Sequence, residues 1–395
     1  MKILYHQRTK SRDGQAVHIR ELIAALRARG HGVQEWALSS GEQGEMGSEG
    51  GLLGRLLARA PRALYELGEH AYGPAVAGRL TAAGRTAGAE IVYERYALGN
   101  TAGLRAARRL GIPLLLEVNS PLARERAEHE TLVFRRWAAR SERRLLQRAD
   151  RVLAVTRVLA DMLVQSGVPR PRVAVVRNGV DLERYPEAAE RDGPGVVIGF
   201  TGFFRAWHRI EDLVDALADG ALPADARLLL VGDGPARASI EARATARGVA
   251  ARVRVTGAVA HAEVPGHVRS MDICVQPAAT PWASPLKLPE YMAAGRAIVA
   301  PDQQNLRELL THGRDALLFD PGQPAALAAA VAQLARDPAR RRALGRAARE
   351  TVVREKLTWD GAAERVEAVA GTCLAERRAV VARGRPDRAA RRTGA

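Results

Sequence analysis

Residues 184–201 read Arg-Tyr-Pro-Glu-Ala-Ala-Glu-Arg-Asp-Gly-Pro-Gly-Val-Val-Ile-Gly-Phe-Thr, and this stretch divides the chain. Its first twelve residues combine Pro, Gly and mixed charge, which is typical of a linker. Val196–Thr201 then reads as a buried strand. On both sides of the linker, short apolar runs alternate with longer amphipathic segments. This alternation predicts an α/β protein with two doubly wound halves, each a parallel sheet covered by helices.

The predicted strands repeat on each side of the linker. In the second half they are Val196–Thr201, Leu228–Gly232, Val253–Thr256, Ile273–Gln276, Ala297–Ala300 and Ala316–Phe319. In the first half they are Lys2–His6, Val33–Leu38, Ile91–Tyr93, Pro113–Val118, Val152–Thr156 and Val173–Val176. Ligands of doubly wound sheets bind at the carboxyl ends of the strands, so we expect the site in a cleft between the halves.

The domain boundaries follow from the linker. We predict Rossmann-like domains at residues 1–186 and 187–358, and a last helix at 359–382 that crosses back to the first domain. Residues 383–395 form a basic tail without apolar periodicity, which predicts disorder. Gly41–Gly51 is rich in Gly, Glu and Ser and predicts a mobile loop.

The charge balance needs a separate interpretation. The 395 residues carry a net charge of +16, but only four of the 60 basic residues are lysines, which indicates a coding bias toward arginine. The basic residues are spread over many segments, which favours a solvated surface over a nucleic-acid partner; an acidic ligand or an anionic membrane is the alternative. Two cysteines and the absence of a long apolar run predict a cytoplasmic protein without a spanning helix.

Several catalytic classes are excluded by missing motifs. The chain has no Gly-Lys dipeptide, which removes P-loop nucleotidases, and no Asp-x-Asp pair for a nucleotide-bound metal. It also has no Gly-x-Ser-x-Gly elbow and no His-Glu-x-x-His helix. We therefore expect no metal site, no cofactor and chemistry without an activated serine.

The most informative segment is Ser284-Pro-Leu-Lys-Leu-Pro-Glu-Tyr-Met-Ala-Ala-Gly295. Pro285 can open a helix, which leaves the backbone N–H groups of Leu286 and Lys287 free to bind an anion. Lys287 adds a full charge at a helix start, where a purely structural helix would prefer an acid. Glu290 lies one turn further on, within reach of a ligand hydroxyl. The segment predicts a site for a phosphate-bearing ligand.

These motifs in this order resemble the retaining glycosyltransferases of GT-B fold, glycosyltransferase family 4 (group 1). The resemblance covers nearly the whole chain. It rests on Ala28-Arg-Gly-His31, Val176-Arg-Asn-Gly-Val-Asp181, Phe200-Thr-Gly202, Val231-Gly-Asp-Gly-Pro235, Val255-Thr-Gly257 and Glu290-Tyr-Met-Ala-Ala-Gly295. It implies a UDP-, GDP- or ADP-sugar donor held mainly by the second domain and an acceptor held by the first.

The resemblance also assigns residues. Glu290 would accept hydrogen bonds from the ribose, and the N–H groups of Leu286 and Lys287 would meet the diphosphate. Arg205 would join them, because a guanidinium suits phosphate oxygens. The nucleobase would lie near Thr256–Val259, which includes Gly257 and Val259. Gly14 would let the first-domain loop approach the donor.

Three positions depart from the family pattern. Trp282 stands where a carboxylate usually contacts the donor sugar. The usual Gly-Arg and Lys-Gly pair is replaced, so that Arg205, His208 and Lys287 would share the diphosphate. Asn119 stands where the family has a histidine near the acceptor; it can hydrogen-bond a sugar but cannot move a proton.

The predicted function is therefore a metal-independent, retaining transfer of a hexosyl group to a hydroxyl of a glycan, a lipid-linked glycan or a small molecule. Lys287, Arg205 and Asn119 are the predicted catalytic residues. A nucleotide-sugar 2-epimerase of related fold and a basic nucleic-acid-binding protein are the alternatives. Peripheral contact with the inner face of an anionic membrane stays open, because leucines and arginines alternate at helical spacing over residues 52–64.

Overall fold

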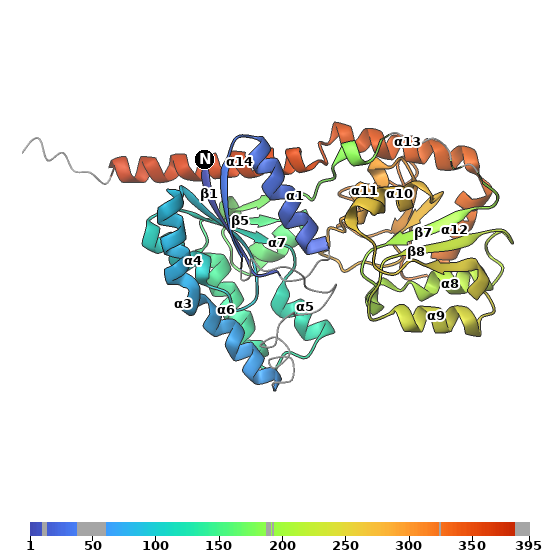
Figure 1. The fold of residues 1–395 in the computed structure, drawn as a ribbon, viewed down its shortest axis with the longest axis horizontal. Coiled ribbons are helices and arrows are strands. Elements are labelled where there is room, and N and C mark those ends of the chain that lie inside the picture. The colour runs from blue at the N-terminus through green and yellow to red at the C-terminus, as the bar shows by residue number, and fades with distance from the viewer. Residues whose placement is uncertain (10–13, 38–60, 187–190, 192, 324, 384–395) are drawn as a thin grey trace, which may run out of the picture.

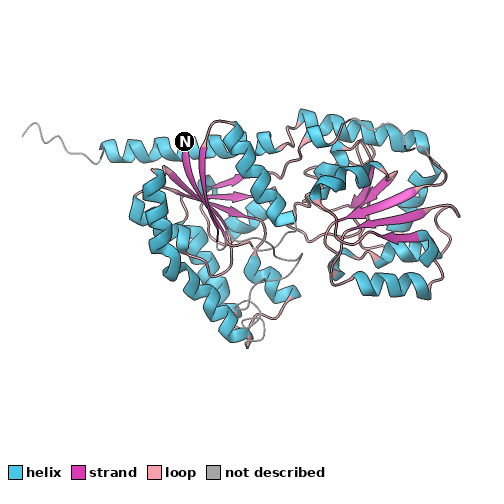
Figure 2. Ribbon diagram, viewed as in Figure 1, coloured by secondary structure: helices cyan, strands magenta, loops and turns pink. Residues whose placement is uncertain are grey.

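The computed structural model describes residues 1–9, 14–37, 61–186, 191, 193–323 and 325–383. They form two α/β units, each with a six-stranded parallel sheet enclosed by helices (Figures 1 and 2). The predicted doubly wound architecture is confirmed.

The first sheet has the strand order β2-β1-β3-β4-β5-β6. Its strands are β1 (Lys2–Gln7), β2 (Gly32–Ala37), β3 (Ile91–Arg95), β4 (Leu114–Val118), β5 (Arg151–Ala154) and β6 (Val173–Val175). The helices between them are α1 (Gly14–Ala28), α3 (Arg62–Ala87), α4 (Ala102–Leu110), α5 (Leu122–His129), α6 (Arg135–Arg148) and α7 (Arg157–Gln165). All five residues of β3 and of β4 are buried. This burial explains why the two strands consist of apolar residues and of polar residues that have partners.

The second sheet has the order β12-β11-β10-β7-β8-β9. Its strands are β7 (Val197–Thr201), β8 (Arg227–Val231), β9 (Val253–Val255), β10 (Ile273–Val275), β11 (Ala297–Pro301) and β12 (Leu317–Phe319). Its helices are α8 (Glu211–Ala218), α9 (Arg237–Ala246), α10 (Val264–Arg269), α11 (Lys287–Ala293), α12 (Ala326–Arg336) and α13 (Pro338–Arg354). Every strand expected from the sequence is present, with ends shifted by no more than two residues.

Both sheets reverse their winding direction next to their first strand. In the first sheet β1 lies between β2 and β3, and in the second sheet β7 lies between β10 and β8. A crevice opens at the carboxyl ends of parallel strands where the order reverses, and such crevices bind ligands. The loops after β1, β3, β7 and β10 therefore mark where a site is expected.

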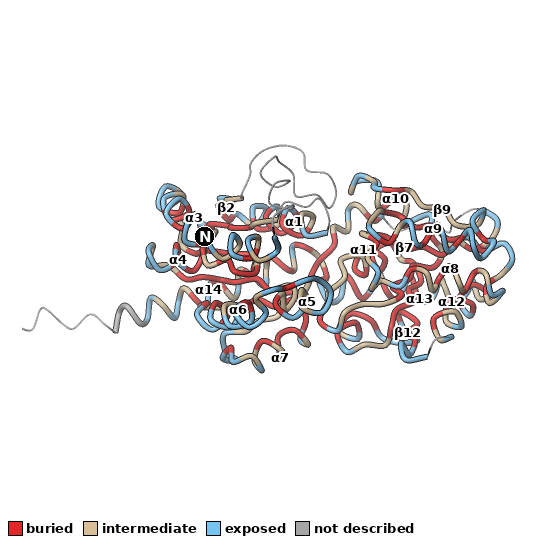
Figure 3. Tube along the Cα trace, turned by 90° about the horizontal axis from the view of Figure 1, so that it is seen from below, coloured by how far each residue is buried: buried red, intermediate tan, exposed pale blue. Residues whose placement is uncertain are grey.

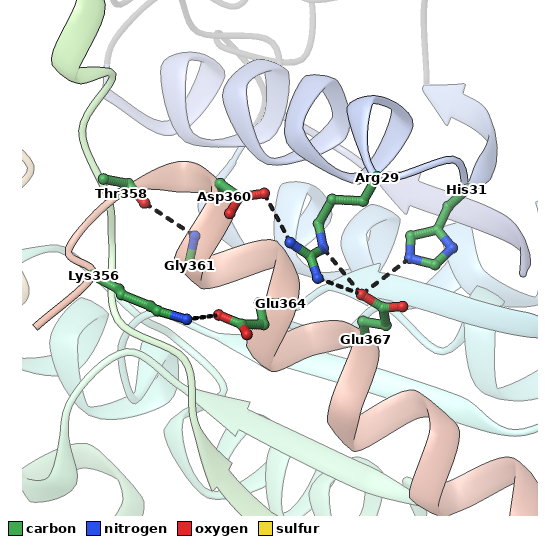
Figure 4. A network of polar contacts seen from close by, with 8 residues as sticks. All are labelled: Arg29, His31, Lys356, Thr358, Asp360, Gly361, Glu364 and Glu367. Atoms are coloured by element: carbon green, nitrogen blue, oxygen red, sulfur yellow. Dashed lines mark hydrogen bonds and ion pairs between the residues drawn. The ribbon is translucent and has the colours of Figure 1, made fainter.

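The last helix, α14 (Trp359–Arg383), leaves the second unit and packs on the first (Figure 1). Arg29, just after α1, donates to Asp360 at 2.9 Å and to Glu367 at 2.8 Å, and His31 lies 3.8 Å from Glu367 (Figure 4). The apolar side of α14 joins the core cluster of the first sheet through Trp359, Ala362, Ala363, Val366 and Ala370. The first unit is thus completed by residues that follow the second.

Three predictions fall outside the described residues. They are the Gly41–Gly51 loop, the amphipathic leucines and arginines of residues 52–60, and the basic tail beyond Arg383. Of the helical material expected over residues 52–87, α3 accounts for Arg62–Ala87.

Candidate active site

A cleft of about 980 Å³ lies between the two units. The first unit lines it with Arg8, Thr9, Arg95 and Tyr96, which end or follow β1 and β3. The second unit lines it with Thr201, Gly202, Val231, Gly232 and Gln276, which end or follow β7, β8 and β10. The carboxyl ends of both sheets therefore face one shared cavity, as the strand order predicts.

The helix α11 brings Lys287 and Glu290 to the second-domain wall of this cleft. The Lys287 Nζ lies 3.7 Å from the centroid of the Phe200 ring, a cation–π contact that holds the ammonium group over the end of β7. A Cβ on Gly202 would lie 3.2 Å from that Nζ, and the φ of Gly202 is +126°. Glycine at position 202 therefore leaves room for the lysine.

Burial shifts both ionisable groups of α11. It lowers the pKa of Lys287 to about 7, while Glu290 acts in the opposite direction. It raises the pKa of Glu290 to about 7, against the lowering effect of Lys287. Two partly buried groups that titrate near neutrality in a cleft are typical of a functional site.

The loop after β7 supplies a second cation. The Arg205 guanidinium lies 4.9 Å from the ring centroids of Phe203 and of Trp207, and these contacts hold it at the cleft. Neither Arg205 nor Lys287 forms an ion pair with another residue in the described part of the chain. The cleft therefore brings two basic side chains together, with Glu290 one turn from Lys287, and this arrangement suits a polyanionic ligand.

His208 lines the same wall but does not act as a third cation. Burial, Lys287 and Arg205 together lower the pKa of His208 to about 3. At neutral pH the imidazole is therefore uncharged and would contribute to diphosphate binding only through hydrogen bonds. The role that His208 would share with Arg205 and Lys287 stays a prediction.

Val259 and Gly257, the two residues predicted to lie near the nucleobase, differ in their positions. Val259 lines the cleft, whereas Gly257 does not. Gly257 adopts a φ of +74° and pairs with Gly232, which itself lines the cleft. A contact between Gly257 and the nucleobase stays a prediction.

Gly14 and Leu286 meet where the units approach each other. Gly14 begins α1 and lines the cleft, and a Cβ at this position would lie 3.1 Å from the Leu286 Cδ1 atom. The glycine therefore permits a close approach of the first unit to the start of α11. The predicted approach of this loop to the donor stays a prediction.

On the first-domain wall, Asn119 belongs to a network around Glu117. The Asn119 Nδ2 donates to the Glu117 Oε1 at 2.6 Å, Arg95 donates to the same oxygen at 2.5 Å, and the Tyr93 hydroxyl donates to Oε2 at 2.5 Å. Burial alone would raise the pKa of Glu117, but His18, Arg95 and the hydrogen bonds hold it well below its usual range. Glu117 is therefore a buried anion that fixes Asn119 and Arg95 at the cleft.

His18 links this network to the second unit. Its Nε2 lies 3.0 Å from Glu117 Oε2, and its Nδ1 lies 2.9 Å from the Asn178 Oδ1. The Asn178 amide in turn donates to the Ser284 carbonyl at 2.8 Å, two residues before Leu286. This chain of contacts sets the position of the α11 loop against the first-domain wall.

Trp282 occupies the position of the missing carboxylate. Its side chain is 2% exposed and packs in the core cluster of the first unit. Its indole Nε1–H donates to Glu125 Oε2 at 3.2 Å, and Glu125 lines the cleft from α5. A carboxylate is thus present near this position, but it belongs to the other unit.

Sequence reasoning missed His18, Asn178 and Glu125 as residues of the cleft, and Glu117 as the buried anion behind its first-domain wall. His18 lies one turn after Gly14 on α1, a helical spacing that could have placed both on one face. Glu94, at the end of β3, does not line the cleft: its carboxylate is fully buried, lies 2.6 Å from the His6 Nδ1 and accepts the Gly103 N–H. Its neighbour Arg95 is the residue that reaches the cleft.

Two negative findings concern the described residues only. No group of three or more His, Cys, Asp or Glu side chains in them has the arrangement of a metal site. None of their helices combines the length and the apolar composition needed to cross a bilayer.

Family models match both units. The model for "Glycosyltransferase Family 4" matches residues 12–184, and the model for "Glycosyl transferases group 1" matches residues 195–337. The break between the two matches falls in the linker that the sequence predicts.

Similar proteins include sugar transferases from actinobacteria. The chain is 30% identical to a 2-deoxystreptamine glucosyltransferase and 28% identical to an alpha-D-kanosaminyltransferase, both of Streptomyces kanamyceticus. These alignments cover 64% and 58% of this chain. It is 31% identical to a GDP-mannose-dependent alpha-mannosyltransferase of Mycobacterium tuberculosis over 56% of this chain. The matched regions span 69%, 63% and 57% of these three relatives, respectively.

Solved structures share the fold. Sucrose-phosphate synthase of Thermosynechococcus elongatus superposes with a TM-score of 0.78 at 20% identity, covering 95% of this chain and all of that one. HepE of Anabaena, solved in complex with UDP, gives 0.73 at 19% identity and covers 94% and 100%. These likenesses establish the GT-B architecture. Taken with the two family models and the identity to known sugar transferases, they show that the chain belongs to glycosyltransferase family 4.

Proposed function

We propose that the protein transfers a hexosyl group from a nucleoside-diphosphate sugar to a hydroxyl group, with retention of configuration and without a metal ion. The observation that carries the proposal is the pairing of Lys287 and Glu290 on one turn of α11, together with Arg205, on the second-domain wall of the interdomain cleft. Two basic side chains suit a diphosphate, and a carboxylate one turn away suits ribose hydroxyls.

The donor would lie along the second domain. Lys287, Arg205 and the backbone N–H groups of Leu286 and Lys287 would bind the diphosphate, because the first N–H groups of a helix have no intrahelical acceptor. Glu290 would accept hydrogen bonds from the ribose, and Val259 would contact the nucleobase. The relatives that use GDP-mannose or glucosyl donors support a nucleotide sugar without fixing its base.

The acceptor would lie against the first domain. Asn119 and Arg95 are fixed there by Glu117 and present an amide and a guanidinium to the cleft. These groups can orient a hydroxyl-rich acceptor but do not remove its proton, because an amide has no basic lone pair and arginine stays protonated.

The bond changes follow from this assignment. The bond between the sugar C1 and the phosphate oxygen breaks, a bond from C1 to the acceptor oxygen forms on the same face, and the acceptor proton passes to the leaving phosphate. The protein stabilises negative charge that grows on the diphosphate, which is the task of Lys287 and Arg205. Removal of one such stabilising group costs about 10²–10³ in rate.

The experiment is a screen of UDP-, GDP- and ADP-sugars with candidate acceptors, followed by NMR of the product anomer. The same anomeric configuration in donor and product is expected. Lys287→Met should lower the rate of transfer about 10²–10³-fold, and Arg254→Met on the exposed edge strand β9 is the matched control. Inversion of configuration would overturn the retaining mechanism. Conversion of the donor into its 2-epimer without acceptor would show the epimerase alternative instead.

A further inference from the structure

Four exposed apolar side chains gather where α3 and α6 begin. Leu64, Leu67, Val133 and Trp137 have exposed fractions between 41% and 56%. Only one other large apolar side chain in the described part of the chain, Val353, is comparably exposed. We call these four residues the apolar tip; the start of α3 forms the lower end of the first domain in Figure 1.

Two contacts hold the apolar tip together. The Glu66 carboxylate accepts the backbone N–H groups of Val133 and Phe134 at 2.7 and 2.8 Å. The His70 ring stacks on the Trp137 ring with centroids 3.6 Å apart. Leu64, Leu67 and His70 follow one another at three-residue spacing and therefore share one side of α3. The leucines thus adjoin the α6 aromatic side chain.

The exposed side of α6 is strongly basic. Its six arginines are all exposed: Arg135, Arg136, Arg140, Arg143, Arg144 and Arg148. None of them forms an ion pair with another described residue. The one acid of this helix, Glu142, is turned inward, where it accepts from the Tyr96 hydroxyl at 2.8 Å and from the Ala123 N–H at 3.0 Å. We call these six residues the arginine stripe. Figure 3 shows exposed turns along α6 in the first domain.

We propose that the apolar tip and the arginine stripe together dock this protein on an anionic lipid bilayer. The guanidinium groups would bind lipid phosphates, and the tip would enter the interface, where a tryptophan ring is favoured. Amphipathic surfaces of this kind bind by apolar burial plus electrostatic attraction. The phosphates of a nucleic acid would also bind the arginine side chains. A nucleic acid, however, offers no apolar phase in which Leu64, Leu67 and Val133 could be buried. The composition of the surface therefore favours a bilayer.

The position of this surface suggests what the bilayer supplies. Tyr65, Gly68, Glu69 and Tyr72 of α3 line the cleft, while Leu64 and Leu67 on the same turns belong to the apolar tip. A docked molecule would hold the acceptor side of the cleft next to the lipid surface. If the proposed transferase activity holds, the acceptor is a lipid-linked hydroxyl compound.

Co-sedimentation with vesicles of phosphatidylglycerol and phosphatidylcholine tests the docking. The full chain should sediment at low salt and be released as salt rises, because the screening length falls from about 30 Å at 0.01 M to about 8 Å at 0.15 M. Arg140→Glu/Arg144→Glu should lower vesicle binding about tenfold or more, since each basic residue near the surface contributes severalfold. Leu67→Gln should weaken binding even at low salt.

The matched control is Arg254→Glu/Arg346→Glu, which makes the same change in net charge at exposed positions of the second domain. It should bind vesicles as the unaltered protein does. An equal loss in this control, or a wild-type protein that stays in the supernatant at low salt, would overturn the proposal. So would duplex DNA binding that depends on the stripe and is indifferent to Leu67→Gln, in the absence of vesicle binding. Calorimetry with UDP, GDP and ADP reports separately on the donor site, so failure of docking and failure of the proposed activity give different results.

Discussion

The indole of Trp282 and the carboxylate of Glu125 join the two domains across the cleft, with 3.2 Å between Nε1 and Oε2. Trp282 follows β10 in the second domain, yet its ring is buried in the core cluster of the first. The Thr156 hydroxyl also donates to the Trp282 carbonyl at 3.2 Å. Trp282 therefore joins the two domains and orients the Glu125 carboxylate at the cleft.

Trp282→Ala should destabilise the protein by about 3–5 kcal/mol, because it leaves a cavity in the first-domain core. Trp282→Phe fills most of that space and removes only the donor to Glu125, at a cost of about 1 kcal/mol. Urea denaturation measures both. Trp137→Ala, an exposed tryptophan, is the control and should change the free energy of unfolding by less than about 1 kcal/mol. Equal effects of Trp282→Ala and Trp137→Ala would contradict the role of Trp282.

Binding of a nucleoside diphosphate should draw a proton onto Lys287. The pKa of the buried amine is lowered to about 7 in the free protein, and a bound diphosphate would raise it. Affinity should then be highest below pH 7 and fall as pH rises toward the higher pKa of the complex. Calorimetry in buffers of different ionisation enthalpy measures the proton uptake. Lys287→Met should remove this uptake, and identical uptake in that variant would assign the proton to another group.

Glu290→Gln should weaken nucleoside diphosphate binding about tenfold to a hundredfold, since a hydrogen bond to a charged group contributes about 1.5–3 kcal/mol. The loss should vanish when the ligand is a 2′,3′-dideoxynucleoside diphosphate, which lacks the ribose hydroxyls. Isothermal calorimetry with both ligands checks this coupling. An undiminished loss with the dideoxy ligand would show that Glu290 acts on another part of the donor.

Chelation should leave the activity intact. Arg205 and Lys287 offer the positive charge that a divalent ion supplies to a diphosphate in other transferases. Turnover in excess EDTA should equal turnover without it, and a metal-dependent transferase assayed in parallel confirms that the chelator is effective. Loss of activity that manganese restores would reject metal independence.

Glu117→Gln should cost about 3–5 kcal/mol at pH 7, because it leaves buried Arg95 without its anion. The folded-state pKa of Glu117 lies below its unfolded value of about 4.3, so its stabilising effect is complete above that pH and is lost as pH falls further. The difference from wild type should therefore shrink only under acid. Glu128→Gln, at an exposed ion pair with Arg124, is the control and should cost less than about 1 kcal/mol.

The fold was predictable because its signals are local. Each strand is a short apolar run between amphipathic segments, and the α11 site lies within twelve consecutive residues, Ser284–Gly295. Lys287 and Glu290 share a helix turn whatever the rest of the chain does, so helical spacing alone brings them together.

The first-domain wall was not predictable for the opposite reason. His18 is 99 residues from Glu117 and 160 from Asn178, and their contacts depend on how α1, β4 and the segment after β6 are placed relative to one another. The pKa of His208 could not be inferred either, because its shift comes from burial and from Lys287, which lies on a distant element.

The return of α14 to the first domain bears on how the protein folds as it is synthesised. Ile3, Tyr5, Ile19 and Leu22 pack in a cluster that includes Val366 and Ala370. While the ribosome is still adding the second domain, the part of this cluster that α14 covers beside α1 stays open. The last strand of the first sheet ends at Val175 and α14 begins at Trp359, so the nascent chain must keep this apolar surface from aggregating while the whole second domain is made. The first domain thus receives its last element only after the second domain has been synthesised, although it emerges first.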